Sequence, residues 1–140
     1  MPEIAFTVPG VPVPQPRPRA CIRGSHASVY GAKSDHAVHA FKATCRLAAR
    51  QAYRGEPLST PLVLSLVFVL PRPQGMRWER KPMPRVPHQT KPDLDNLYKS
   101  TVDALTGLLW LDDKQIYRDE TSKWIAAGDE QPHVRVRVSG

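Results

Sequence analysis

The 140-residue sequence has few of the features that mark secreted, membrane-spanning or thiolate-metal proteins. It contains only two cysteines, Cys21 and Cys45, and no CxxC pair. Neither a disulfide framework nor a zinc site is therefore expected, and each thiol is interpreted as a small apolar residue. The longest apolar run, PLVLSLVFVLP, is shorter than the roughly 18 residues of a membrane helix, and the first residues lack the pattern of a secretory signal. We expect one domain over residues 1–140, cytoplasmic and without a membrane partner.

Acidic residues are scarce in the first two thirds of the chain. Residues 1–92 hold 14 Lys or Arg and 4 Asp or Glu, whereas residues 93–140 hold 6 and 9. The isoelectric point near 9.8 is typical of nucleic-acid-binding proteins, because basic side chains release condensed counterions from phosphates. Charge alone also fits a basic protein with no such partner. A basic body with one acidic segment is, however, what an enzyme that cuts phosphodiesters needs.

Fifteen prolines exclude regular structure from several segments. Residues 8–20 are proline-rich and are predicted to be extended, neither helix nor central strand. A strand is expected before them, where Ile4, Phe6 and Val8 alternate, and a hairpin after them at residues 20–31.

A basic amphipathic helix is predicted from residue 36 to about residue 54. Ser34 or Asp35 is expected to cap it, and Gly55 to end it. The predicted buried face is formed by Val38, Phe41, Cys45, Ala48, Ala49 and Ala52. Arg46, Arg50 and Arg54 fall on the opposite face and are expected to point outward.

The remaining elements complete an α+β domain, a mixed β-sheet packed with two main α-helices. The run at residues 61–71 predicts a buried central strand. Residues 72–91, here called the basic loop, show no periodicity. Apolar residues recur at helical spacing over residues 94–106, and Gly107 is a natural end. Two further strands are expected, at residues 115–126 and at residues 133–139, where valines and arginines alternate.

The acids cluster first in the stretch TKPDLDNLYKS. Asp93 follows Pro92 and is well placed to cap the helix, with Asp95 in its first turn. Capping alone would explain both residues. Their side chains could instead converge on the positive end of the helix dipole. A calcium-binding loop is excluded, because the required oxygen ligand, glycine and glutamate are absent at Leu97, Tyr98 and Ala104.

A second acidic pair, Asp112 and Asp113, follows the helix in WLDDKQI. Whether it returns to the first pair depends on strand order, which the sequence does not show, and a solvated turn would also explain it. Gathered carboxylates would suit Mg²⁺ or Mn²⁺, which prefer oxygen ligands. Lys99, four residues after Asp95, is either a surface ion pair or a cation that offsets charge on a phosphate.

The stretches KPDLDNLYKSTVDALTG and LWLDDKQI, followed by a strand with SK, resemble the RusA-type Holliday junction resolvases of bacteria and prophages. The proline-rich TVPGVPVPQPRPRA resembles the N-terminal segment of phage-borne members. The resemblance implies a homodimeric, Mg²⁺-dependent endodeoxyribonuclease that cuts four-way DNA junctions. It implies catalytic roles for Asp93, Asp95, Asp113 and Lys99, with the three aspartates as metal ligands and Asp112 as a further or supporting ligand.

The expected DNA contacts are basic residues that would hold the phosphate backbone rather than read bases. They are Arg17, Arg19, Arg72, Arg77, Arg80, Lys81 and Arg85. Trp78 is interpreted as a half-buried anchor of the basic loop, with stacking on the junction as the alternative. Two other functions stay open, a non-catalytic DNA-binding protein whose aspartates only cap a helix, and a nuclease for flaps, single strands or RNA.

Overall fold

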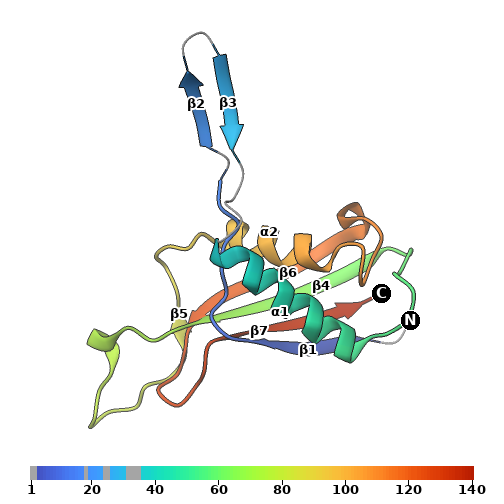
Figure 1. Cartoon of the computed structure of the whole chain (residues 1–140). Coiled ribbons are helices and arrows are strands. Elements are labelled where there is room, and N and C mark those ends of the chain that lie inside the picture. Colours follow the sequence, from blue (N-terminus) through green and yellow to red (C-terminus); the bar gives the residue numbers. More distant parts are fainter. Residues whose placement is uncertain (1–2, 18, 24–25, 31–35) are drawn as a thin grey trace.

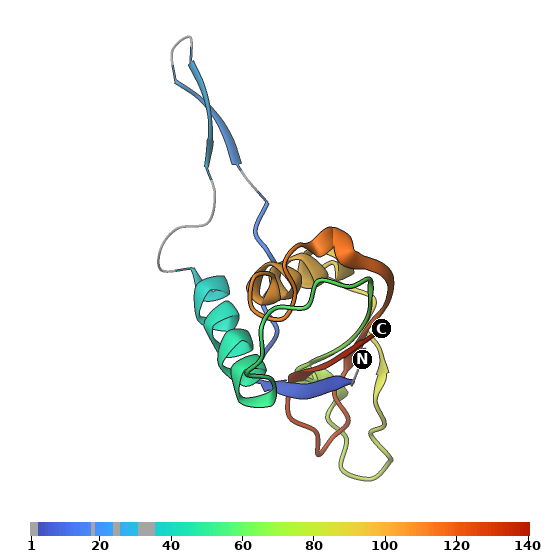
Figure 2. The same ribbon diagram turned by 90° about the vertical axis from the view of Figure 1, so that its right-hand side faces the viewer.

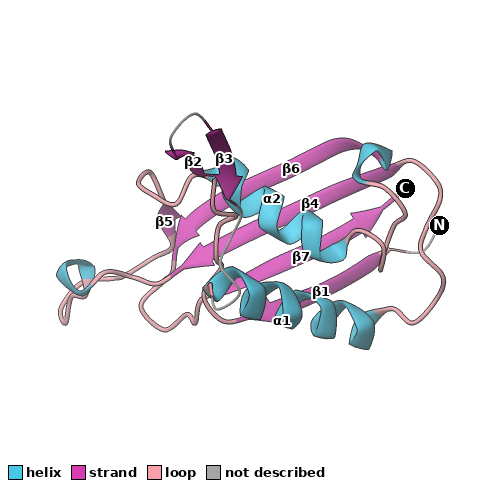
Figure 3. Ribbon diagram, turned by 45° about the horizontal axis from the view of Figure 1, so that its top comes forward, coloured by secondary structure: helices cyan, strands magenta, loops and turns pink. Residues whose placement is uncertain are grey.

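The computed structural model describes residues 3–17, 19–23, 26–30 and 36–140. Two helices cover one face of a five-stranded mixed sheet, with one hydrophobic core between them, so the predicted α+β class is confirmed (Figures 1 and 3). The sheet order is β1-β7-β4-β6-β5. The elements are β1 Ile4–Pro9, β2 Arg19–Arg23, β3 His26–Tyr30, α1 Ala37–Ala52, β4 Leu62–Leu70, η1 Gln74–Met76, β5 Val86–Pro87, α2 Leu94–Leu105, η2 Asp113–Gln115, β6 Ile116–Ile125 and β7 His133–Ser139.

The central strand is β4, as its apolar sequence predicts. It pairs in parallel with β6 and antiparallel with β7. The even-numbered residues from Leu62 to Leu70 are buried in the core below the helices. On β7, Val134, Val136 and Val138 are buried in the same core, whereas the arginines between them are exposed, which confirms the predicted alternation.

The first helix, α1, packs as predicted but begins differently. Its N-cap is His36, whose Nδ1 accepts a hydrogen bond from the Val38 backbone N–H at 3.0 Å. The predicted cap at Ser34 or Asp35, which lie outside the described residues, is therefore wrong.

Four of the six residues predicted for the buried face of α1 are fully buried, and Ala48 is partly buried. Ala52 is exposed at the last position of the helix, so that part of the prediction is wrong. Arg46, Arg50 and Arg54 are exposed, as predicted. Cys45 lies in the core, and its burial raises the pKa of the thiol to about 12, so this residue behaves as a small apolar side chain.

The second helix, α2, follows the predicted boundaries. Its N-cap position is Asp93, and Gly107, just beyond its last turn, has a φ of 90°. Glycine adopts this left-handed conformation without a steric penalty, which explains the end of the helix there. Because α2 packs between α1 and β6, the acids at its start lie above the sheet.

The proline-rich segment runs without helix or strand from Val11 to Arg17, between β1 and the predicted hairpin. The hairpin is confirmed as β2 paired with β3, and it extends away from the sheet (Figures 1 and 2). The basic loop is mostly irregular, as predicted, but contains η1 and the two-residue strand β5, which pairs with the end of β6. In the described part of the chain, no helix is long and apolar enough to cross a membrane.

Candidate active site

The carboxylate of Asp93 is not used to cap α2. Asp93 occupies the N-cap position with an extended backbone, but its side chain makes no capping hydrogen bond. Instead, its Oδ2 lies 3.3 Å from Arg17 Nη2, and half of the side chain is exposed. The interpretation that the aspartates serve only as caps therefore does not describe Asp93.

A small hollow beside α2 brings together three of the residues predicted for catalysis. Its volume is about 310 Å³. Asp95, Lys99 and Asp113 line it, together with Asn96, Tyr98, Val102 and Asp103, and we call it the acidic hollow. Strand order explains the meeting of distant residues, because η2 carries Asp113 into β6, which packs under α2.

The acids of the acidic hollow have few structural partners of their own. Asp95 Oδ1 accepts a hydrogen bond from the backbone N–H of its neighbour Asn96 at 3.0 Å. Asp103 lies 3.9 Å from Lys42 of α1 and so links the two helices. Tyr98 reaches from α2 toward β6, and its pKa is raised by burial and then by the carboxylates of Asp119 and Asp113. The Tyr98 hydroxyl therefore keeps its proton near neutral pH.

The two acids of the second pair have different environments. The Asp112 carboxylate caps η2, accepting a hydrogen bond from the Lys114 N–H at 3.0 Å, while Gln115 closes the other half of a capping box. The pKa of Asp112 is lowered, first by that N–H and then by the Asp113 side chain. Asp113 faces the acidic hollow, and Asp112 does not line it. Asp112 thus stabilises the start of η2, whereas Asp113 lines the acidic hollow.

The predicted convergence of all four carboxylates on one point is not seen in the described residues. Asp93 lines a different hollow, on the other side of the start of α2. Within the described ranges, no three Asp, Glu, His or Cys side chains are close enough to share one metal ion. The structure therefore brings Asp95, Asp113 and Lys99 together and leaves Asp93 and Asp112 beside them.

Lys123 and Asp119 of β6 belong to this region and are absent from our predicted site. Lys123 Nζ donates hydrogen bonds to the carbonyls of Thr90 and Pro92, immediately before Asp93. Asp119 acts on Tyr98 through its charge. Residues 117–120 of β6 are all exposed, so no alternation in the sequence marks Asp119, which lies opposite Leu64 of β4 in the parallel pair.

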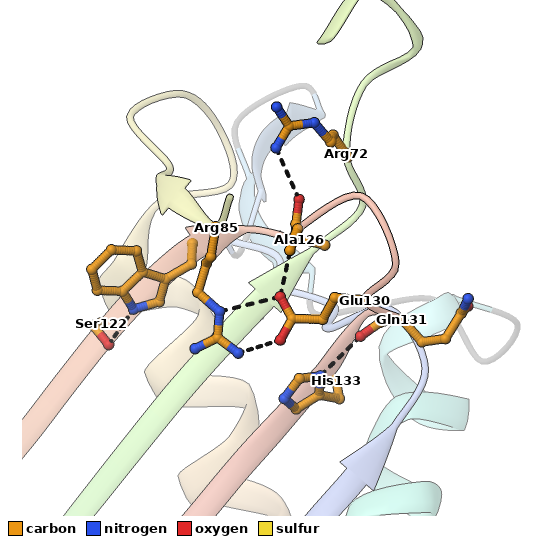
Figure 4. A network of polar contacts seen from close by, with 9 residues as sticks. Arg72, Arg85, Ser122, Ala126, Glu130, Gln131 and His133 are labelled. Carbon is orange, nitrogen blue, oxygen red and sulfur yellow. Dashed lines mark hydrogen bonds and ion pairs between the residues drawn. The ribbon is translucent and has the colours of Figure 1, made fainter. Parts of the chain in front are cut away.

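Arg72, predicted to contact DNA, is buried, with 4% of its surface exposed. Its Nε donates to the Met76 carbonyl at 2.7 Å, and its Nη1 donates to the carbonyls of Pro84 and Ala126 at 2.9 and 3.3 Å. Its guanidinium also lies 4.8 Å from the ring centre of Trp78. Figure 4 shows the contact with Ala126. The prediction that Arg72 contacts DNA is therefore wrong, because its side chain is bonded to Met76 and Pro84 within the basic loop and to Ala126 just after β6.

Arg85 is also bonded to its own chain. It forms a two-point ion pair with Glu130, whose Oε1 also accepts a hydrogen bond from the Ala127 N–H at 3.1 Å (Figure 4). This pair raises the pKa of Arg85 and lowers that of Glu130. It holds the basic loop against the turn that follows β6.

The other expected DNA contacts are more accessible. Arg17, Arg77, Arg80 and Lys81 are exposed, and the side chain of Arg19 lies outside what the structure describes. Lys81 Nζ lies 4.1 Å from the ring centre of Trp78, and Arg77 reaches the Gly128 carbonyl at 3.4 Å. Trp78 is half-buried and has both Lys81 and Arg72 over its ring, in agreement with its interpretation as a loop anchor.

Comparison with known proteins identifies the family of the chain. Residues 9–139 match the family model described as endodeoxyribonuclease RusA. The chain belongs to the RusA endodeoxyribonuclease family. A protein of Bacillus subtilis (strain 168), YqaN, is 34% identical over 142 residues, which cover 96% of this chain and 94% of that protein. YqaN is described as uncharacterised, so the family, and not this relative, indicates a DNA endonuclease.

Proposed function

We propose that this chain is a Mg²⁺-dependent endonuclease that resolves four-way DNA junctions by paired cuts in recombination and repair. The observation that carries the proposal is the acidic hollow, in which Asp95 and Asp113 face Lys99 in a chain of the RusA family. Mn²⁺ has the same ligand preference and is the alternative ion.

The donor set of the acidic hollow fits such an ion. Mg²⁺ usually keeps several waters and takes only one or two carboxylates together with phosphate oxygens, so a cage of three acids is not required. Asp95 and Asp113 would hold it, and Asp93 would join them by turning away from Arg17. A bound divalent ion supplies an activated water and offsets negative charge on the phosphate.

The remaining side chains have roles that do not depend on the number of ions. The Lys99 ammonium would offset the charge that grows on the phosphate during cleavage. The protonated Tyr98 hydroxyl can donate a hydrogen bond to a phosphate or water oxygen in the hollow. Arg17, exposed beside Asp93, would hold a neighbouring phosphate.

Resolution of a junction needs two related cuts, and one acidic hollow per chain supplies one cut. A symmetric dimer would place two such sites on a substrate that is itself two-fold symmetric. We therefore propose a homodimer as the active form. Sedimentation of the purified protein should give a mass close to twice the 15.7 kDa of the chain.

The test is a Mg²⁺ titration with four labelled nucleic acids: a fixed four-way DNA junction, a DNA duplex of the same sequence, a DNA flap and an RNA hairpin. We expect symmetric nicks in the junction that require Mg²⁺ and leave 5′-phosphate ends. Asp95→Asn should bind the junction without cutting it. Asp129→Asn, which changes an exposed acid in the turn between β6 and β7, should behave like the wild type.

Other outcomes would select the alternatives. Junction binding with no nick at any Mg²⁺ concentration would favour a non-catalytic DNA-binding protein. Faster cleavage of the flap or of RNA than of the junction would favour a different nuclease with the same metal chemistry.

A further inference from the structure

A second hollow lies on the other side of the start of α2. Its volume is about 710 Å³, and it opens between the extended segment after β1 and the residues that lead into the helix. Its walls are largely apolar, formed by Val11, Pro12, Pro14, Pro16, Leu70 and Pro92. We call it the proline-walled hollow. Asp93 lines it, and Asn96 lines both this hollow and the acidic hollow.

The wall of the proline-walled hollow is held in place by α2. The Gln15 backbone N–H donates to the Asn96 carbonyl at 2.9 Å, and Ser100 Oγ donates to the Val13 carbonyl at 2.6 Å. Pro12 is buried, and Val13 packs against the core. A ligand would therefore meet a preformed surface, which reduces the entropy lost on binding.

The rim of this hollow carries cations, and its wall carries an unsatisfied polar atom. Arg17 and Lys91 are both exposed there. Gln15 Oε1 is buried and has no hydrogen-bond partner among the described residues. A hydrogen bond from a ligand to this buried, unpaired carbonyl oxygen would stabilise the complex.

We propose that the proline-walled hollow holds the nucleobase and sugar next to the scissile phosphate, an inference that rests on the proposed endonuclease function. A phosphate at the acidic hollow has a nucleoside on each side, and the proline-walled hollow is the neighbouring cavity, since Asn96 lines both. Apolar walls suit the flat face of an unstacked base, which costs least to extrude where pairing is already broken, as at a branch point. Arg17 and Lys91 would hold the phosphates beyond it.

The hollow would also set the preference among cleavage sites. Glutamine recognises base edges through its carbonyl and amide groups. The unpartnered Gln15 Oε1 would accept a hydrogen bond from the exocyclic amino group of a base, so adenine, cytosine or guanine should be preferred over thymine, which has no such group.

The first experiment measures the base without requiring cleavage. A junction carries 2-aminopurine on one side or the other of the scissile phosphate, and its fluorescence is followed on binding to the wild-type protein in EDTA. We expect a rise at one of the two positions and none two nucleotides away. No change at either position would mean that the bases stay stacked, and would overturn the proposal. The variant Val11→Glu places a charge in the wall of the hollow. If this variant loses the dimer but keeps the 2-aminopurine signal, the hollow is filled by a second copy of the chain and not by a base, and the proposal is overturned.

The second experiment varies the base and the wall in Mg²⁺. Replacing the affected nucleotide by an abasic site should slow single-turnover cleavage about tenfold, and Gln15→Ala should reduce the preference among the four bases to less than twofold. Gln15→Ala keeps the backbone bond to Asn96, so its melting temperature should match the wild type. Equal cleavage of all four bases and the abasic junction by the wild type would contradict the inference. No cleavage of any junction would instead contradict the proposed function.

A separate observation concerns Lys123 at the end of β6. Its ammonium donates to the carbonyl of Pro92 at 2.7 Å and to that of Thr90, and its own carbonyl accepts from the His88 N–H at 3.2 Å. The pKa of His88 is lowered by burial and then by the Lys123 charge, so His88 adds no second cation there. The main chain and the side chain of Lys123 thus connect β6 to residues 88–92, which lead into Asp93.

The geometry assigns Lys123 as a positioning residue that fixes the place of Asp93. Lys123→Met should lower the kcat for junction cleavage at least tenfold with the junction Kd within twofold, and should raise the Mg²⁺ concentration for half-maximal rate. Lys123→Arg, which can still donate to both carbonyls, should recover most of the rate. Wild-type kinetics for Lys123→Met would overturn this assignment. A fall in melting temperature with unchanged Mg²⁺ dependence would do the same.

Discussion

The acidic hollow and the basic loop are both charge clusters in the sequence, but their side chains are used in opposite ways. In the hollow, the Asp95 side chain accepts a hydrogen bond from its neighbour Asn96 and, among the described residues, from no other, and Asp113 lines the same hollow as Lys99. In the loop, Arg72 and Arg85 are bonded to carbonyls or to Glu130 of their own chain. In this chain, the charged side chains that indicate a function are those whose hydrogen-bonding groups are not already used by other residues of the protein.

The physical reason lies in the backbone of the two regions. An irregular loop has carbonyls with no partner in a helix or sheet, and a buried arginine can satisfy several of them at once. A helix N-terminus has free N–H groups that a carboxylate could satisfy in the same way. The Asp93 side chain could have done so but lies toward Arg17 instead.

The largest effect is expected for Asp113→Asn compared with Asp112→Asn. Loss of the Asp113 charge from the acidic hollow should lower junction cleavage on the order of a thousandfold. Asparagine is as good an N-cap as aspartate, so Asp112→Asn should keep η2 and stay within about tenfold of the wild type. Single-turnover gels with both variants measure the difference. Equal losses in the two variants would remove the distinction between a free and a capping acid.

The second effect concerns Lys99. Lys99→Ala should slow cleavage about a hundredfold, because a cation that offsets charge in the transition state is lost. Junction binding should weaken much less, since most of the affinity comes from other phosphate contacts. Parallel losses of rate and affinity would assign Lys99 to DNA binding instead.

On the basic side, Arg72→Met is expected to act on stability. Three carbonyls would lose their donor, at a cost of about 3 kcal/mol in the free energy of unfolding. The matched variant Arg80→Met removes an exposed cation and should change stability by less than about 0.5 kcal/mol. In Arg80→Met, the slope of log K for junction binding against log salt concentration should instead decrease by about one. Urea unfolding and binding titrations over a range of salt would distinguish them, and the reverse pattern would refute our placement of Arg72.

The smallest effect is the pH dependence of the Arg85–Glu130 pair. The pKa of Glu130 lies below its ordinary value of 4.5, so the pair stabilises the fold fully above that pH. This contribution should disappear as the pH falls through the lowered pKa. Glu130→Gln should therefore have a lower free energy of unfolding at pH 7. Measured by urea unfolding, this free energy should also fall less steeply with decreasing pH below 4.5 than in the wild type. An unchanged pH dependence would mean that the pair is not formed in solution.

Much of the scaffold was predictable from local patterns. The alternation of Val134, Val136 and Val138 with arginines, and the helical recurrence after Asp93, fix which faces are buried. The C-terminal end of α2 follows from the left-handed backbone of Gly107. Its start was correctly placed at Asp93, although the Asp93 side chain makes no capping hydrogen bond. The site acids lie at these boundaries, so their places in the chain were predictable as well.

Other features depend on contacts between distant segments, which no local pattern contains. The burial of Arg72 requires the carbonyls of Pro84 and Ala126 at its side. The meeting of Asp113 with Asp95, and the separation of Asp93 from both, require the order of β6 and β4 under α2. The hydrogen bonds of Lys123 likewise join residues 31 and 33 positions apart.

The central claim is that Asp95 and Asp113 hold the same metal ion. It is tested most directly by diffraction from crystals of the protein with a four-way junction and Mn²⁺, recorded at the manganese edge. Our account predicts an anomalous peak within coordination distance of an oxygen of both side chains and of one DNA phosphate. A peak that touches neither carboxylate, with the phosphate bound elsewhere, would contradict it.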